Sequence, residues 1–293
     1  MHTVSKPKAK AGTMAALLII LQDLLYGFGD PITKIAYESV PVFSLLAVRY
    51  TIALTVLLLI FGRRILQGLR TARIRSWLVP GLCIGSCYIL SNIALSLTDA
   101  TAVAFLRSLS TVFTPLLMIF TAKARMRRSH IFILGAVLIG LYLLCCTNGL
   151  KSFGIGEILA LCSALLMAGS LEFARQALDD IDPIALTAAQ AAISALLAMI
   201  CAFIFNGGLQ LQSATLPAWG VIFYLGICCT MLGYLLQNQA MRTIPSRTVA
   251  LIQCACPVLT AVFSFILLHE TLSVRGIIGA VIILVSVILE IIL

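Results

Sequence analysis

The chain has 293 residues, of which 61% are hydrophobic and only 11% are charged, whereas about a quarter of an average soluble domain is charged. The composition excludes a soluble enzyme and predicts an all-α integral membrane protein. The net charge of +9 does not indicate a nucleic-acid partner, because the basic residues lie in short clusters between apolar runs. The ten cysteines lie inside apolar stretches as small packing residues, and we expect neither a metal site nor a cofactor.

Apolar runs divide the chain into ten predicted transmembrane helices, since a spanning helix needs about 20 apolar residues. In chain order they cover residues 14–36, 41–62, 77–97, 101–121, 130–147, 155–177, 183–206, 217–238, 247–268 and 274–293. No polar stretch between them is long enough to fold by itself. The fifth connection, around Gly149, is the predicted midpoint, so we expect two five-helix units, 1–149 and 150–293.

The positions of lysine and arginine predict the orientation in the membrane. If the N-terminus is cytoplasmic, nearly all basic residues between the spans fall on the cytoplasmic side, and only Lys34, Lys151 and Arg275 remain for the other side. This asymmetry follows the positive-inside rule. We expect a multi-pass protein of a bacterial-type inner membrane, in contact with the lipid bilayer and with both termini in the cytoplasm.

The two halves of the chain repeat one another. The pattern Tyr-x-Leu-x-Asn-x-Ala begins at Tyr88 and again at Tyr234, in the third and eighth predicted helices. Because five spans are an odd number, the second half must cross the membrane in the opposite sense to the first. Inverted-topology repeats of this kind are typical of secondary transporters, whose substrate sites lie near the midplane between the repeats.

The last two predicted helices carry a more specific pattern. It consists of residues 248–251, Pro257, residues 269–273, Gly276 and Gly279, and it resembles the corresponding helices of the EamA family, a branch of the drug/metabolite transporter superfamily. The resemblance implies ten helices in two repeats and a transporter rather than an enzyme. Members of this family export amino acids, carry sugars or metabolites, or expel cationic drugs.

Charged residues within predicted spans are the first candidates for function: Asp23, Asp30, Arg49, Arg107 and Glu172. Each costs about 2.5–3.5 kcal/mol at a helix centre, so they should face a polar cavity or one another. Arg107 suits a substrate carboxylate, and Asp23 suits a substrate amine, a proton or Arg107. The alternative is structural ion pairing, with Arg49 near the membrane surface and Glu172 paired with Arg175 at i and i+3.

Neutral polar residues recur at helical spacing on the third, eighth and ninth predicted helices. They are Tyr88, Asn92, Tyr234, Asn238 and Gln253. Within each Tyr–Asn pair the residues are four apart and share a helix face. Two such faces meeting at the centre would form a hydrogen-bonding substrate site; the alternative is hydrogen bonding between helices.

Glycines, prolines and one acid are candidates for helix breaks or gates, which alternating access requires. The glycines and the first proline are expected to interrupt the first helix, and the other two prolines the fourth and ninth. The acid near the outer end of the ninth helix suits either a gate or simple solvation. These residues are Gly27, Gly29, Pro31, Pro115, Pro257 and Glu270.

These features predict a secondary transporter of small polar metabolites, with amino acids or related zwitterions preferred because the charges within the spans have both signs. Energy would come from the substrate gradient or from a coupled proton or ion. A multidrug or organic-cation exporter and a carrier of a nucleotide-derived metabolite such as S-adenosylmethionine are the alternatives. The Gly-x-Gly-Asp sequence that ends at Asp30 occurs in intramembrane aspartyl proteases, but the second catalytic motif that such an enzyme needs is missing.

Overall fold

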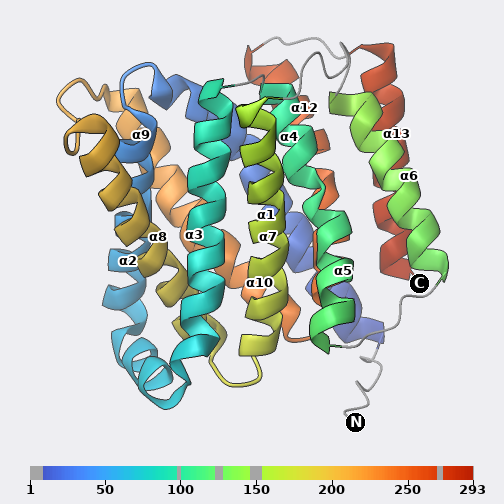
Figure 1. The fold of residues 1–293 in the computed structure, drawn as a ribbon, viewed down its shortest axis with the longest axis horizontal. Helices are drawn as coiled ribbons and strands as arrows, with labels where there is room; N and C mark the ends of the chain where they lie inside the picture. Colours follow the sequence, from blue (N-terminus) through green and yellow to red (C-terminus); the bar gives the residue numbers. More distant parts are fainter. Residues whose placement is uncertain (1–8, 98–99, 123–127, 146–153, 269–272, 293) are drawn as a thin grey trace.

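The computed structural model describes residues 9–97, 100–122, 128–145, 154–268 and 273–292, and these residues form helices without any strand. The helices run up and down between two ends of one bundle (Figure 1). The start of the first helix and the end of the last lie at the same end of the bundle, which we call the terminal end. We call the opposite end the distal end.

The helices follow the predicted apolar segments closely. In the first half they are α1 (Ala9–Tyr37), α2 (Val42–Thr71), α3 (Ile74–Leu97), α4 (Ala100–Ser108), α5 (Ser110–Ala122) and α6 (Arg128–Cys145). In the second half they are α7 (Ile155–Ala177), α8 (Pro183–Asn206), α9 (Leu216–Tyr224), the π-helix η1 (Leu225–Leu232), α10 (Gly233–Met241), α11 (Ser246–Ile252), the 3₁₀-helix η2 (Gln253–Ala255), α12 (Cys256–Leu268) and α13 (Val274–Ile292).

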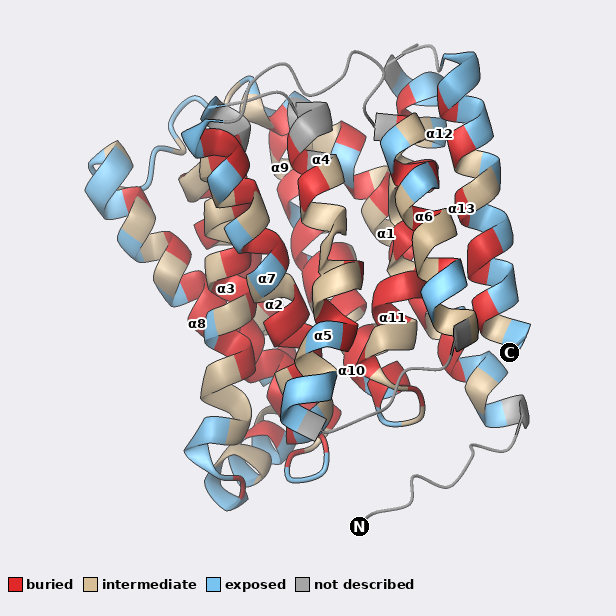
Figure 2. Cartoon of the chain, turned by 45° about the vertical axis from the view of Figure 1, so that its right-hand side comes forward, coloured by how far each residue is buried: buried red, intermediate tan, exposed pale blue. Residues whose placement is uncertain are grey.

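Within these residues, 8 helical segments are long and apolar enough to cross a membrane, and two shorter apolar helices, Phe105–Thr121 and Ser129–Leu144, occupy the fourth and fifth predicted positions. Figure 2 shows the buried residues on the inner faces of the bundle and exposed ones on its outside. Many large apolar side chains are exposed on the outside of the bundle, including Leu59 and Phe120, which are each 81% exposed. Such a surface requires lipid rather than water around it.

Helix α2 is longer than the sequence predicted. Its 30 residues correspond to about 45 Å, which exceeds the roughly 30 Å thickness of a bilayer core. The helix kinks at Phe61, where φ is −123° and ψ is 16°. Arg63, Arg64 and Arg70 follow this kink, so the basic end of α2 is the part that projects beyond the apolar span.

The helix breaks differ from the predicted ones in the first and fourth segments. Helix α1 is continuous through Gly27, Gly29 and Pro31, so the predicted interruption is wrong; a proline inside a spanning helix removes one backbone hydrogen bond without ending the helix. The fourth segment breaks at Leu109, between α4 and α5, and Pro115 lies inside α5.

The ninth segment breaks beside Pro257, as the sequence predicted. The 3₁₀-helix η2 separates α11 from α12, and Pro257 is the second residue of α12. Proline cannot donate the backbone hydrogen bond that would continue an α-helix, and a short 3₁₀ turn accommodates this loss. The residues around Glu270 and the boundary between 149 and 150 lie outside the described residues.

The helix contacts between the two halves come in pairs, which are related by exchanging each helix for its equivalent in the other half. Helix α2 packs on α8, and α6 packs on α13, so equivalent helices of the two halves meet. Helix α3 packs on α7, as α9 and α10 pack on α1. Helices α4 and α5 also pack on α7, as α11 and α12 pack on α1. The most extensive contacts between the first half and the second therefore have counterparts in which the halves are swapped.

Candidate functional site

Three charged side chains lie at one level of the bundle. Asp30 is seven residues before the end of α1, and Arg49 and Arg107 are each seven residues after the start of α2 and α4. All three helix ends are at the distal end of the bundle (Figure 1). Seven residues are two helical turns, or roughly 10 Å. The three helices therefore place these charges at a common depth, two turns inside the distal end.

Arg49 is held by aromatic rings and a hydroxyl group. Its guanidinium carbon lies 5.0 Å from the ring centre of Tyr50 and 5.7 Å from that of Tyr88, and its Nε donates to Thr230 Oγ1 at 3.2 Å. The residue is 8% exposed. Contacts of this kind between a cation and ring faces stabilise by about 0.5–2 kcal/mol. They hold Arg49 in the interior of the bundle.

The π-helix η1 presents Thr230 to Arg49. Its backbone comes so close to α2 that a Cβ added at Gly226 would lie 2.9 Å from the carbonyl oxygen of Arg49. π-helical turns inside α-helices are rare and are frequent at functional sites. No feature of the sequence around 225–232 predicted this turn.

Asp30 of α1 and Arg107 of α4 bring opposite charges to this level. Asp30 is exposed and accepts a hydrogen bond from Thr260 Oγ1 of α12 at 3.2 Å. Arg107 is partly buried, next to the break at Leu109. The charges of Asp30 and Arg107 act on one another, and Arg49 also acts on Asp30, but these groups form no direct ion pair. One acid and two arginines at a common depth are suited to a small ligand that carries both charges.

Tyrosines join this group from several helices. Tyr37 donates a hydrogen bond to Asn92 Oδ1 at 3.0 Å, and Asn92 Nδ2 donates to the backbone oxygen of Tyr88 at 2.7 Å. The hydroxyls of Tyr234 and Tyr50 are 3.5 Å apart, and the rings of Tyr50 and Tyr88 are 6.3 Å apart. The two repeat-related tyrosines, at 88 and 234, therefore both contact Tyr50.

The other predicted polar residues form an amide layer. Gln253 Nε2 donates to Gln237 Oε1 at 2.8 Å, and Gln22 Nε2 donates to the same oxygen at 3.0 Å. Asn238 shares no hydrogen-bond partner with Asn92 and donates to Thr187 and Gln190 of α8 at 2.9 and 2.8 Å. Gln22 precedes Asp30 on α1 by about two turns. The amide layer therefore lies between the charged group and the terminal end.

Glu172 and Asp23 differ sharply in their surroundings. Glu172 accepts hydrogen bonds from Thr121, Gln176 and Ser246, whereas Arg175 pairs with Asp179 at 3.2 Å; the predicted pairing of Glu172 with Arg175 is wrong, because the arginine turns toward the following loop. Asp23 is 0% exposed, and neither of its carboxylate oxygens has a hydrogen-bond partner.

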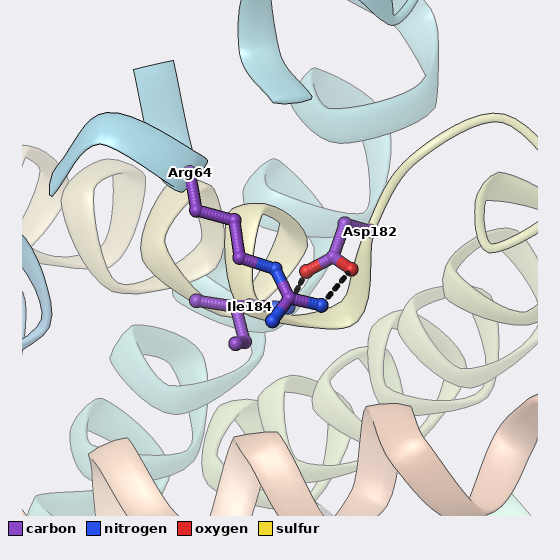
Figure 3. Close-up of polar contacts among 3 residues, drawn as sticks. All are labelled: Arg64, Asp182 and Ile184. Carbon is purple, nitrogen blue, oxygen red and sulfur yellow. Dashed lines mark hydrogen bonds and ion pairs between the residues drawn. The ribbon is translucent and has the colours of Figure 1, made fainter. Parts of the chain in front are cut away.

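A separate cavity of about 320 Å³ lies near the terminal end. Figure 3 shows Arg64 at this place, with its Nη2 2.7 Å from Asp182 Oδ2, while Asp182 Oδ1 accepts from the backbone of Ile184 at 2.9 Å. The rest of the lining is mostly apolar. The nearby Asp180 accepts from the Ser76 hydroxyl and the Arg73 backbone, which lowers the pKa of that carboxyl. None of the predicted site residues lines this cavity.

The three charges Asp30, Arg49 and Arg107 and the polar side chains that surround them form the charged group. From the sequence prediction of the substrate site it contains Arg107, Tyr88, Asn92 and Tyr234. It also contains Tyr37, Tyr50, Thr230 and Thr260, which the prediction did not assign to a site; among these, only Tyr50 could have been suspected from the sequence, because it directly follows Arg49. Among the described residues, no three His, Cys, Asp or Glu side chains are grouped so as to hold a metal ion.

Comparison with known proteins extends over both halves. A sequence model described as the EamA-like transporter family matches residues 13–146 and again residues 154–292. No curated protein matches the chain. A solved structure, described only as "Crystal structure of protein", superposes with a TM-score of 0.81 over 93% of this chain and 94% of that one, at 19% identity. At this identity the likeness shows a shared fold.

Proposed function

Because the chain belongs to the EamA-like transporter family, and hence to a family of membrane transporters, we propose that it is a secondary transporter of small polar metabolites. Amino acids or related zwitterions are the proposed substrate class. The proposal rests on one observation: Asp30, Arg49 and Arg107 lie at one level, and the charge of Asp30 interacts with those of both arginines without a direct ion pair.

The charges of this group complement a zwitterion. A guanidinium binds a carboxylate through two parallel N–H donors, and Arg49 uses only its Nε in the contact with Thr230, which leaves its terminal nitrogens for a ligand. Asp30 is exposed and suits an ammonium group. An organic cation would meet two arginines for one acid, which disfavours the drug-exporter alternative. An S-adenosyl compound carries the same zwitterion, and the ring of Tyr88 offers a stacking face.

We further propose that the ten apolar segments form two inverted repeats that alternate access to this site. The exchange symmetry of the helix contacts supports this arrangement, since each half can rock against the other about equivalent contacts. In the present conformation the amide layer separates the charged group from the terminal end, whereas Asp30 is exposed. If both termini are cytoplasmic, as the basic residues predict, this is an outward-facing state in the inner membrane.

Counterflow in proteoliposomes tests the substrate class. Vesicles that hold purified protein and are loaded with unlabelled amino acids should accumulate the labelled amino acid added outside. Arg107→Ala should abolish this accumulation because the carboxylate loses its partner, while Arg175→Ala, which alters an arginine paired with exposed Asp179, should preserve it. Full counterflow by Arg107→Ala would remove Arg107 from the site. Accumulation of an adenosyl compound or an organic cation in place of amino acids would replace the proposed substrate class.

A further inference from the structure

Asp23 stands apart from the other buried carboxylates of the described residues. Glu157, Glu172 and Glu290 each accept at least one hydrogen bond. Asp23 is 0% exposed, and both of its carboxylate oxygens are buried without a hydrogen-bond partner. No arginine, lysine or histidine among the described residues forms an ion pair with it.

An ionised carboxylate in this position would be expensive. Burying an isolated charge without partners is so unfavourable that the group instead becomes neutral, and the bilayer around the bundle provides no water to relieve the cost. A carboxylic acid, in contrast, is a neutral group of nearly the same size. The surroundings of Asp23 therefore fit the protonated form.

Asp23 is linked to the charged group by the packing of α1 against α12. Asp23 and Asp30 are seven residues apart on α1 and share a face. Cys256 of α12 lies within electrostatic range of both acids and of Arg107. One turn further along α12, Thr260 donates its hydroxyl hydrogen bond to Asp30. A proton gained or lost at Asp23 therefore changes the charge beside the group that we assign to substrate.

Among the described residues, the groups around Asp23 include no cation that could replace a proton. Cys256 comes from α12, and the amides of Gln22 and Gln237 in the layer beside it are neutral. One turn along α1, Tyr26 is within electrostatic range of Arg49 and of Cys229 in η1, but Arg49 is held by Thr230 and the tyrosine rings. A charged Asp23 would therefore need water as its partner.

We propose that Asp23 is a proton-binding site of the transport cycle, which holds a proton in the conformation seen here and releases it to water when the terminal side of the bundle opens. The inference rests on the proposed transport function and deepens it by naming the coupled ion. Each cycle would then move a proton from the distal to the terminal side, together with or in exchange for the substrate.

Infrared spectroscopy of the protein in lipid at pH 7 tests the protonation directly, because a carboxylic acid has a C=O stretching band that a carboxylate lacks. We expect this band in the wild type, its loss in Asp23→Asn, and its retention in Asp30→Asn, the same substitution two turns along α1. Absence of the band, or its persistence in Asp23→Asn, would overturn the proposal. If Asp23→Asn does not fold, aspartate labelled with ¹³C answers the same question: the band must shift on labelling in both the wild type and Asp30→Asn.

A second measurement separates coupling from substrate class. During amino-acid uptake, vesicles with a trapped pH indicator should report a pH change with the wild type and none with Asp23→Asn. Amino-acid transport without the acid band or the pH change would refute the proton site and leave the proposed function intact. The acid band without amino-acid transport would refute the substrate class and leave the proton site.

Discussion

At the residue scale, the central feature is an arginine whose charge is balanced by ring faces instead of an acid. Tyr50 and Tyr88 contact Arg49 through their π-systems, and Thr230 accepts from its Nε. An ion pair in this position would compete with a substrate carboxylate, whereas ring faces leave the in-plane donors free. The tyrosines thus make a buried cation tolerable without using its hydrogen-bonding capacity.

Arg49→Lys tests this reasoning because it keeps the charge and removes the planar fork. A lysine cannot bind a carboxylate through two parallel donors or donate from the Nε position to Thr230. We expect amino-acid counterflow to fall about tenfold, which corresponds to roughly 1.4 kcal/mol, with little change in thermal stability. Arg63→Lys, at an exposed position of α2, is the control. Wild-type counterflow by Arg49→Lys would show that only the charge of Arg49 matters.

Which side chains meet could be predicted only partly. The charges and the Tyr–Asn pairs were found because polar residues are rare and costly in a span. Spacing places Tyr234 and Asn238 on one face of α10, yet it does not say which neighbour each contacts: Tyr234 meets Tyr50, and Asn238 meets α8. The contacts of Arg49 depend on the π-helix η1, for which the local sequence contains no signal.

At the element scale, the positions of the helices were predictable to within a few residues for most segments, because the thickness of the bilayer fixes the length of an apolar run. The places where helices break were not. Pro31 leaves α1 continuous, and the fourth segment breaks at Leu109 instead of Pro115, because tertiary contacts decide whether a lost backbone hydrogen bond bends a spanning helix. The glycines of α1 have a different role, namely close packing.

Gly27 allows α1 to approach α12. A Cβ added at this position would lie 2.7 Å from the Cβ of Leu259 and 3.1 Å from its backbone, so Gly27→Ala must push the two helices apart. We expect a destabilisation of about 1–3 kcal/mol and a lower thermal unfolding midpoint. At Gly135 on α6, an added Cβ meets nothing within 4 Å, and Gly135→Ala should stabilise the protein by up to about 1 kcal/mol. Equal midpoints for the two variants would contradict the role assigned to Gly27.

At the scale of the whole molecule, the two halves are joined at the terminal end by the Arg64–Asp182 ion pair as well as by the packing of α2 on α8. Arg64 belongs to the first half and Asp182 to the second. The cavity beside this pair is also lined by Leu18 of α1 and Leu236 of α10, the helices that carry two members of the amide layer. The ion pair therefore lies on the side of the bundle through which the proposed site would open in the other state of the cycle.

Asp182→Asn isolates the contribution of this pair. Asparagine caps a helix as well as aspartate does, so the bond to the Ile184 backbone at the start of α8 is kept while the attraction to Arg64 is lost. Because the side chain of Arg64 is 58% exposed, the pair contributes at most about 1 kcal/mol. We expect backbone hydrogen exchange in α10 and the first turns of α8 to become about two- to fivefold faster, which is the change that a difference of 0.4–1 kcal/mol in opening free energy produces.

Comparison with Arg64→Gln decides whether the ion pair is the cause. If the attraction between the two side chains holds the terminal end closed, Arg64→Gln, Asp182→Asn and the double variant should show the same acceleration, since the second change removes nothing further. If the effects of the two single variants add in the double variant, each residue acts through a different contact. In that case α2 and α8 are held together by their packing alone, and opening of the terminal end must be controlled by the amide layer of Gln22, Gln237 and Gln253.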